Sequence, residues 1–249
     1  MVVSFLRPSL YDTEEPHIHS GVMYMIDMHN HVLFGVDDGC ATLEESIAMI
    51  EQAVKVGVTD LIVTPHFAPM RGFVADRSTI DANFVQMNDA VREHNLPISL
   101  YLGREIDEVS DIETLLAEAT VQTMNNTKYV LVDFGMKKAD IDEYVYELVI
   151  RGYKPIIAHP ERYNYITDTD EFHRWRQTGA LLQINATSLF HPKNKLVKKH
   201  VQYLLKHGLV DMVGSDCHKN PRNYDDFAKA IKTVQKKYPN NVLKHEVLL

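Results

Sequence analysis

From Ile26 onward, apolar and polar positions follow one repeating order along the chain. A short apolar run of β type leads into a loop with polar residues, and then into a stretch where apolar residues recur at helical spacing. The apolar runs predict strands at 26–29, 60–64, 98–102, 129–134, 154–158, 181–185 and 210–214. The helical spacing predicts helices at 42–56, 80–94, 112–118, 140–151, 171–178, 193–207 and 224–238. Seven βα units without a linker predict one α/β domain built on a parallel sheet.

Residues at the ends of the predicted helices support these boundaries. The segment Thr42-Leu43-Glu44-Glu45 is typical of a capping box at a helix start. Four predicted helices end in a glycine before the next strand, as expected of left-handed caps: Gly57, Gly152, Gly179 and Gly208. We predict that the sheet closes into a distorted, TIM-like (β/α)7 barrel. An open doubly wound sheet is the alternative, although the chain has no glycine-rich nucleotide-binding motif to favour it.

Composition and charge narrow the class of protein. The 249 residues are 45% hydrophobic and 24% charged, with a formal net charge of −8. This charge argues against nucleic acid as the main partner, because phosphate backbones bind cationic patches. Cys40 and Cys217 provide no disulfide framework, and no apolar run is long enough to span a membrane, so we expect a cytoplasmic protein without membrane insertion. Residues 1–24 are mixed and polar, and we expect a disordered leader before a domain at 25–249.

Side chains that commonly bind metals follow most of the predicted strands. His29 and His31 lie two residues apart at a strand end, so both imidazoles should point to the same face. Asp216 and His218 show the same spacing after the last strand. The strand ends of a parallel barrel meet at one rim, where we expect nine nitrogen and oxygen donors to converge. These donors are His29, His31, Asp38, His66, Glu105, Asp133, His159, Asp216 and His218.

Nine such donors suit two or three divalent cations better than one. Mixed nitrogen and oxygen ligands fit manganese, iron, cobalt or zinc, and the residues alone do not choose among them. Three divalent cations carry more positive charge than four carboxylates neutralise, so the site should attract an anion, with phosphate as the natural candidate. Arg162 and Arg222 lie close in sequence to predicted ligands, and their guanidinium groups could bind phosphate oxygens.

Four segments of the chain carry a resemblance to a known family. The residues Met25–His31, Val36–Gly39, Ile157–Tyr163 and Ser215–His218 resemble motifs of the polymerase and histidinol phosphatase (PHP) superfamily. The likeness extends from Met25 to the C-terminus and is greatest to the bacterial manganese-dependent tyrosine-protein phosphatases of capsule and exopolysaccharide operons. It implies a seven-stranded PHP barrel with a trinuclear, most often manganese, centre. A metal-activated hydroxide would hydrolyse phosphotyrosine, on the tyrosine-bearing C-terminal tail of a membrane-associated bacterial tyrosine kinase.

The resemblance also implies how the ligands are shared. One metal would be bound by His29, His31, Glu105 and Asp216, a second by Glu105, Asp133 and His159, and a third by Asp38, His66 and His218. Asp38 stands where many superfamily members have histidine, which favours the phosphatase branch. Asp133 stands where the subfamily usually has glutamate, and its side chain is one methylene shorter. It would therefore either bind the metal after a small backbone shift or through water, or orient a histidine.

The sequence leaves alternative functions open. A small-molecule phosphoesterase such as a histidinol phosphatase would use the same metal chemistry. The loop 67–77, with Phe67, Met70, Arg71 and Phe73, could frame an aryl phosphate, and the alternative is a mobile surface loop. A catalytically silent scaffold that binds a kinase tail is disfavoured because the ligand set is complete. A cysteine phosphatase is excluded, because neither Cys40 nor Cys217 has an arginine at the required C-x5-R spacing.

Two further expectations concern surfaces. The helix that starts near Thr42, with Glu44 and Glu45 exposed, could mediate homo-oligomerisation, as the resemblance suggests for relatives. Six histidines fall outside the strand-end pattern, and we expect them at the surface: His94, His173, His191, His200, His207 and His245.

Overall fold

The computed structural model describes residues 25–108, 111–135, 138–219 and 222–249. The predicted leader, residues 1–24, lies outside the described residues, and so do the side chains of Arg222 and Asn223. Within the described part of the chain, no helix is both long and apolar enough to cross a membrane.

The strands form two parallel sheets, and at two places the chain passes directly from a strand of one sheet to a strand of the other. One sheet has the order β1 (Ile26–Asp27), β2 (Asp60–Val63), β4 (Ser99–Leu102). The other has the order β3 (His66–Phe67), β5 (Glu105–Asp107), β6 (Tyr129–Asp133), β7 (Lys154–Ala158), β8 (Leu181–Asn185), β9 (Met212–Gly214). Of the nine strands in the described part of the chain, seven lie within the predicted ranges. The other two, β3 and β5, follow β2 and β4 after two intervening residues and are not predicted by the apolar pattern.

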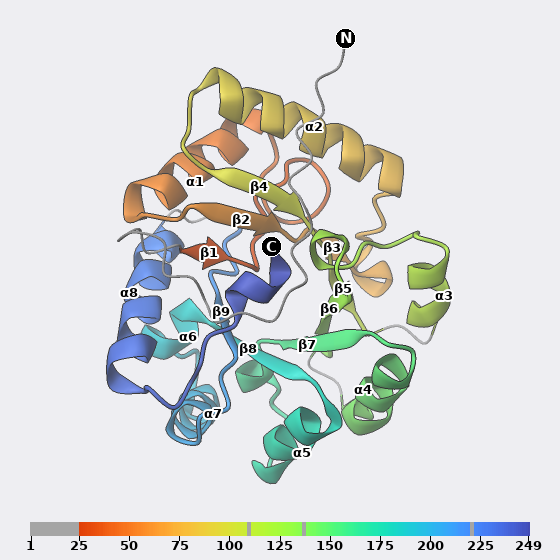
Figure 1. Cartoon of the computed structure of the whole chain (residues 1–249), viewed down its shortest axis with the longest axis vertical. Coiled ribbons are helices and arrows are strands. Elements are labelled where there is room, and N and C mark those ends of the chain that lie inside the picture. Colours follow the sequence, from red (N-terminus) through yellow and green to blue (C-terminus); the bar gives the residue numbers. More distant parts are fainter. Residues whose placement is uncertain (1–24, 109–110, 136–137, 220–221) are drawn as a thin grey trace, which may run out of the picture.

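The first and last strands meet just beyond their ends. Asn30 forms a parallel bridge with Cys217, and the backbone N–H of His31 donates to the carbonyl of Cys217 at 2.8 Å. The N–H of Asp216 donates to the carbonyl of His29 at 2.8 Å. These bonds close the curled sheet into the distorted barrel that the seven βα units predict, with the helices around its outside (Figure 1).

The helices lie close to their predicted positions. Thr42 caps the first helix by accepting from the N–H of Glu45, and Gly57 ends it in the left-handed conformation. The helices are α1 (Leu43–Val56), α2 (Arg77–Glu93), α3 (Ile112–Ala117), α4 (Ile141–Ile150), α5 (Asp170–Thr178), α6 (Ala186–Phe190), α7 (Lys195–Lys206) and α8 (Arg222–Lys237). The short helix α6 is not predicted by the apolar pattern. Single 3-10 turns follow β3, α3 and β7: η1 (Pro69–Arg71), η2 (Met124–Asn126) and η3 (Pro160–Arg162).

The C-terminal turn η4 (His245–Leu248) fills the end of the barrel away from the strand carboxyl ends, and the C-terminus lies in the middle of the strand ring (Figure 1). Leu248 packs with the apolar residues inside the barrel, and its carbonyl accepts from Asn125 at 2.9 Å. His245 bonds the backbone of Val213. The prediction that all six remaining histidines lie at the surface is therefore wrong for His245 and also for His200, which are 7% and 1% exposed. The histidine type alone does not reveal that a ring nitrogen of each residue meets the backbone, of Glu161 for His200 and of Val213 for His245.

Candidate metal centre

The two histidines that follow β1 are oriented by partners from distant parts of the chain. His29 Nδ1 lies 3.0 Å from Gln183 Oε1, on β8. His31 Nδ1 lies 2.8 Å from Asp37 Oδ2. The Nε2 atom of each ring therefore faces Glu105. His29 Nε2 lies 3.2 Å from Glu105 Oε1, and His31 Nε2 lies 3.3 Å from Glu105 Oε2. Strand alternation thus places both rings on one face, as predicted, and the two partners fix which nitrogen is presented.

Glu105, the first residue of β5, lies at the centre of the cluster. It is fully buried and lies within 3.3 Å of four imidazoles, those of His29, His31, His66 and His159. Burial raises the pKa of Glu105, but His29 and His66 outweigh it and hold the pKa well below its usual value. Burial lowers the pKa of His29, but Glu105 and Asp216 raise it to about 9. Both shifts favour a charged carboxylate paired with protonated imidazoles, and a cation that binds here would displace those protons.

Several of these buried atoms lie within ion-pair distance of one another but form no hydrogen bond of good geometry among the described residues. They include His29 Nε2, His31 Nε2, His66 Nδ1 and Glu105 Oε2. A buried polar atom without a well-formed hydrogen bond costs free energy, and here such atoms face one another. A bound cation would satisfy them together, so the donors present fit a metal centre.

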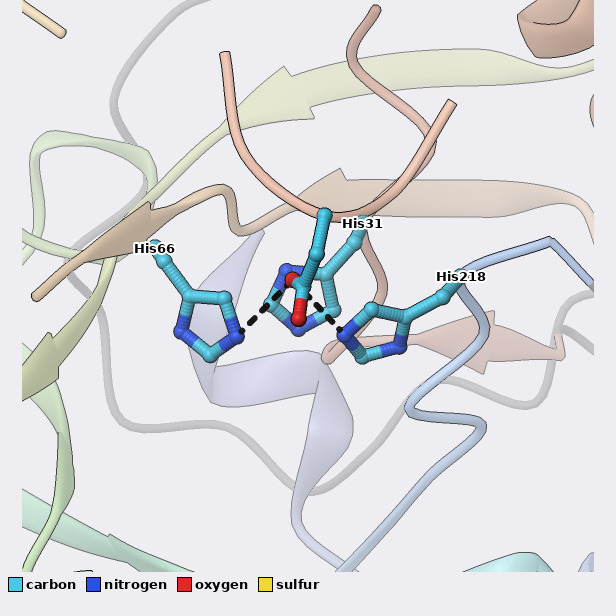
Figure 2. A group of neighbouring side chains, drawn as sticks. His31, His66 and His218 are labelled. Atoms are coloured by element: carbon cyan, nitrogen blue, oxygen red, sulfur yellow. Dashed lines mark ion pairs between the residues drawn. The ribbon is translucent and has the colours of Figure 1, made fainter. Parts of the chain in front are cut away.

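Three groups of side chains bring possible ligand atoms within 4.8 Å of one another: His31, Asp38, His66 and His218; His29, His31 and Glu105; and Glu105, Asp133 and His159. Figure 2 shows the rings of His31, His66 and His218 converging, with dashed ion pairs that correspond to Asp38 Oδ1 at 3.6 Å from His66 and 3.4 Å from His218. These neighbourhoods parallel the three sites that the family resemblance implies. They differ in that His31 also belongs to the group around Asp38.

Asp216 lies beside these groups without belonging to one. Its Oδ1 is 3.7 Å from His29 Nε2 and 3.5 Å from His31 Nε2. Its Oδ2 accepts from Arg162 at 3.0 Å and from Asn185 at 2.5 Å. Burial raises the pKa of Asp216, but the hydrogen bond from His31 and the nearby histidines hold it far below its usual value. The structure thus places Arg162 next to the predicted ligands, while the Arg222 side chain lies outside the described residues.

Asp133, the last residue of β6, is also at the centre. Its Oδ1 is 3.9 Å from His159 Nδ1 and accepts from the N–H of Gly135 at 2.7 Å. Both roles considered for it, metal ligand and orienting carboxylate, fit this position.

Sequence reasoning missed several side chains that position the ligands. Asp37 and Gln183 hold the two histidines of the first motif. Asp27 accepts from the N–H and hydroxyl of Ser215 at 2.9 and 2.7 Å, which ties the first motif to the last. For Asp37 a signal existed, since it stands directly before the predicted ligand Asp38. For Gln183 no local signal marks its contact with a histidine 154 residues away.

A cavity of about 490 Å³ opens beside the cluster. Two cations, Arg71 and Arg162, border it together with Met70, Phe134 and Tyr163. Asp107, Glu108 and Asp133 contribute carboxylates to its wall. A larger cavity, of about 600 Å³, lies between α1 and α8 and is lined mainly by lysines, and it includes none of the predicted metal ligands. The smaller cavity is therefore the one that adjoins the candidate chemistry.

The fold and this cluster define a class: parallel α/β barrels with a His, Asp and Glu centre, able to bind metal, at the strand ends. Residues 25–248 match the family model for capsular polysaccharide synthesis, CpsB/CapC. The tyrosine-protein phosphatase CpsB of Streptococcus agalactiae is 33% identical over 221 residues, which cover 84% of this chain and 89% of the relative. The chain belongs to the CpsB/CapC family.

Two solved structures support the fold. A chain from the structures of YwqE of Bacillus subtilis and CpsB of Streptococcus pneumoniae, metal-dependent tyrosine phosphatases, matches with a TM-score of 0.76 and 26% identity, over 88% of this chain and 96% of that one. The histidinol phosphate phosphatase of Lactococcus lactis matches with a TM-score of 0.53 and 15% identity, over 84% and 93%. The second likeness concerns the fold alone. The predicted PHP-type barrel and the predicted family are confirmed.

Proposed function

We propose that this protein is a metal-dependent tyrosine-protein phosphatase that acts in the cytoplasm. It would use two or three divalent cations, and we propose Mn²⁺ as the metal. The observation that carries the proposal is the buried cluster of possible ligand atoms around Glu105, beside a cavity bordered by Arg162. Family membership adds that relatives with 30% or more identity are named as tyrosine-protein phosphatases.

The residues of this chain would divide the work as follows. The bound cations would polarise the phosphoryl group and lower the pKa of a water molecule, so that a nucleophile forms near neutral pH. Arg162 would donate to the phosphoryl oxygens, and Asp216 fixes its guanidinium from behind at 3.0 Å. Met70 and Phe134 offer apolar surface to an aromatic ring. The phenolate is a moderate leaving group, because the pKa of its conjugate acid is about 10.

The physiological substrate would be a phosphotyrosine in the C-terminal tail of a bacterial tyrosine kinase that regulates capsule or exopolysaccharide synthesis. The family's description, capsular polysaccharide synthesis, supports this setting. A histidinol phosphatase would share the barrel, but the matched structure of such an enzyme is 15% identical, against 26% for the matched tyrosine phosphatase structure. The tyrosine phosphatase is therefore the better-supported reading.

Phosphate release tests this function directly. The purified protein is given a phosphotyrosyl peptide or histidinol phosphate, each with Mn²⁺ or with a chelator. We expect Mn²⁺-dependent turnover that strongly favours the peptide, and its near loss in Arg162→Met. Arg174→Met is the matched control, because Arg174 is 48% exposed and pairs with Asp142 and Asp168 on the outside of the barrel. Preference for histidinol phosphate, or equal turnover in chelator, would contradict the proposal.

A further inference from the structure

A second guanidinium group reaches the cavity from the loop that follows β3. Arg71 is the last residue of the turn η1 and borders the same cavity as Arg162. Its Nη2 donates to Asp38 Oδ2 at 2.9 Å, and its side chain is 40% exposed. The charge is therefore held beside the predicted ligands and remains open to a bound molecule.

The loop that carries Arg71 has a defined shape. Ala68 and Phe73 exchange two backbone hydrogen bonds, of 2.8 and 3.1 Å, which close the loop on itself. The Arg71 guanidinium lies over the Phe73 ring, 4.9 Å from its centroid. Phe73 in turn stacks on His66, with centroids 5.6 Å apart and an angle of 11°. Arg71 is thus positioned through an aromatic contact to one of the predicted ligands.

Arg104 binds the backbone at both ends of this loop. It is fully buried, and its Nη2 donates to the carbonyls of His66 at 3.0 Å and Ala75 at 3.2 Å, which lie at the two ends of the loop. Its guanidinium also lies 5.6 Å from the Phe67 ring centroid. A buried arginine with two carbonyl acceptors limits how far either end can move. The loop is accordingly a support for Arg71, and the expectation of a simply mobile surface loop is not favoured by these contacts.

Arg71 and Arg162 share two features, a carboxylate partner and a place at the wall of the same cavity. Each donates to a carboxylate of the predicted ligand set, Arg71 to Asp38 at 2.9 Å and Arg162 to Asp216 at 3.0 Å. Each is partly exposed, at 40% and 32%, and both border one cavity. Arg71 also has its Nη1 3.3 Å from His66 Nε2. Guanidinium groups have five N–H donors in a planar fork, so these contacts still leave donors for phosphate oxygens. Two such groups across a cavity suit a tetrahedral dianion.

We propose that Arg71 is a second phosphate-binding residue, which contacts the phosphoryl oxygens of the aryl phosphate together with Arg162. This inference rests on the proposed phosphatase function and adds to it a catalytic residue on the loop after β3. The competing role for Arg71 is that of a counter-ion that only holds Asp38. The two roles differ in what is lost with the side chain: a counter-ion affects metal binding, whereas a phosphate ligand affects anion binding at unchanged metal content.

The test measures binding of inorganic phosphate to the Mn²⁺-loaded protein by calorimetry, with metal content determined in parallel. Arg71→Met should weaken phosphate binding by about ten-fold or more, since it removes a charged donor, and Arg71→Lys should weaken it less. Arg77→Met is the matched control, because Arg77 is 41% exposed and also pairs with an aspartate at 2.9 Å, and it should bind phosphate normally. Unchanged phosphate binding in Arg71→Met, or a loss of Mn²⁺ that accounts for the weaker binding, would overturn the inference.

The same variants separate this inference from the proposed function. Turnover of the phosphotyrosyl peptide by the wild-type protein tests the function, whatever Arg71 does. With the function established, Arg71→Met should raise KM and lower kcat for the peptide, and the Arg77→Met control should change neither. A wild-type protein without Mn²⁺-dependent turnover would contradict the function alone, since the phosphate-binding comparison does not use catalysis.

Discussion

Replacing Asp37 with asparagine tests whether a carboxylate outside the predicted ligand set determines metal affinity. Asp37 Oδ2 lies 2.8 Å from His31 Nδ1 and accepts from the N–H of His66 at 2.9 Å. Its Oδ1 accepts from the N–H of Gly39 at 2.8 Å. The side chains of Asp37 and His31 are both 0% exposed. Every contact of Asp37 thus uses an acceptor, and Asp37→Asn must turn an N–H donor toward at least one of these groups.

The pKa of Asp37 gives the magnitude. Burial raises this pKa, but His31 and the backbone N–H groups of His66 and Gly39 outweigh it and lower the pKa from 3.8 to about 2. A difference of about two units corresponds to roughly 2.5 kcal/mol of preference for the charged form over a neutral one. Asparagine loses that preference, and with it the acceptor that holds the His31 ring. We therefore expect Asp37→Asn to weaken Mn²⁺ binding by roughly 10- to 100-fold, the usual effect of removing a partner that orients a metal-binding histidine.

The assay is a calorimetric titration of the metal-free protein with Mn²⁺. Asp89→Asn serves as the control, because Asp89 is 59% exposed and pairs only with Arg92 among the described residues. Circular dichroism in chelator shows whether Asp37→Asn remains folded, so that weaker binding is not a consequence of unfolding. A folded Asp37→Asn protein that binds Mn²⁺ as tightly as the wild type would refute the reasoning, since His31 would then need no carboxylate to hold it.

Two further predictions concern packing and pH. A Cβ at Gly214 would lie 2.6 Å from the Cβ of His29. Gly214→Ala should therefore displace the His29 ring and reduce Mn²⁺ affinity at least ten-fold, measured by the same titration. Unaltered affinity would show that the strand can shift without cost. Burial lowers the pKa of His245, so its contribution to stability is complete above the unfolded pKa of 6.5 and is lost as the pH falls below it. Melting temperatures in chelator should therefore fall less between about pH 7 and pH 5 for His245→Leu than for the wild type, and parallel curves would contradict this assignment.

Much of the fold could be predicted from the sequence because the signals are local. The apolar runs mark all seven strand positions, and the caps at Thr42 and Gly57 place the ends of α1 correctly. The two strand interruptions, after Val63 and after Leu102, could not be predicted in this way. At the second interruption a Cβ at Gly103 would lie 2.8 Å from the Met124 sulfur, a close approach that the apolar pattern does not reveal.

The predicted ligands converge for the same reason that the strands could be predicted: residues at strand ends of one parallel barrel share a rim. What the sequence lacks is the set of partners that orient them. Gln183, on β8, meets His29 only because the closed barrel brings β1 to the far side of β9, and Arg71 reaches Asp38 only through the shape of its loop. Such contacts depend on closure, and closure is a property of the whole sheet.

Two residues of the candidate metal centre have a strained backbone conformation. His159 and Asp216 have φ values of 33° and 49°, which non-glycine residues rarely adopt. Such a conformation costs on the order of 1–3 kcal/mol per residue and persists only where the surroundings hold it. Here the holding contacts are visible: the N–H of His159 donates to Gln183, and Asp216 is bonded by Arg162 and Asn185. Because Gln183 serves both His29 and His159, one side chain couples the orientation of two predicted ligands, and its loss should affect neighbouring metal groups together rather than one alone.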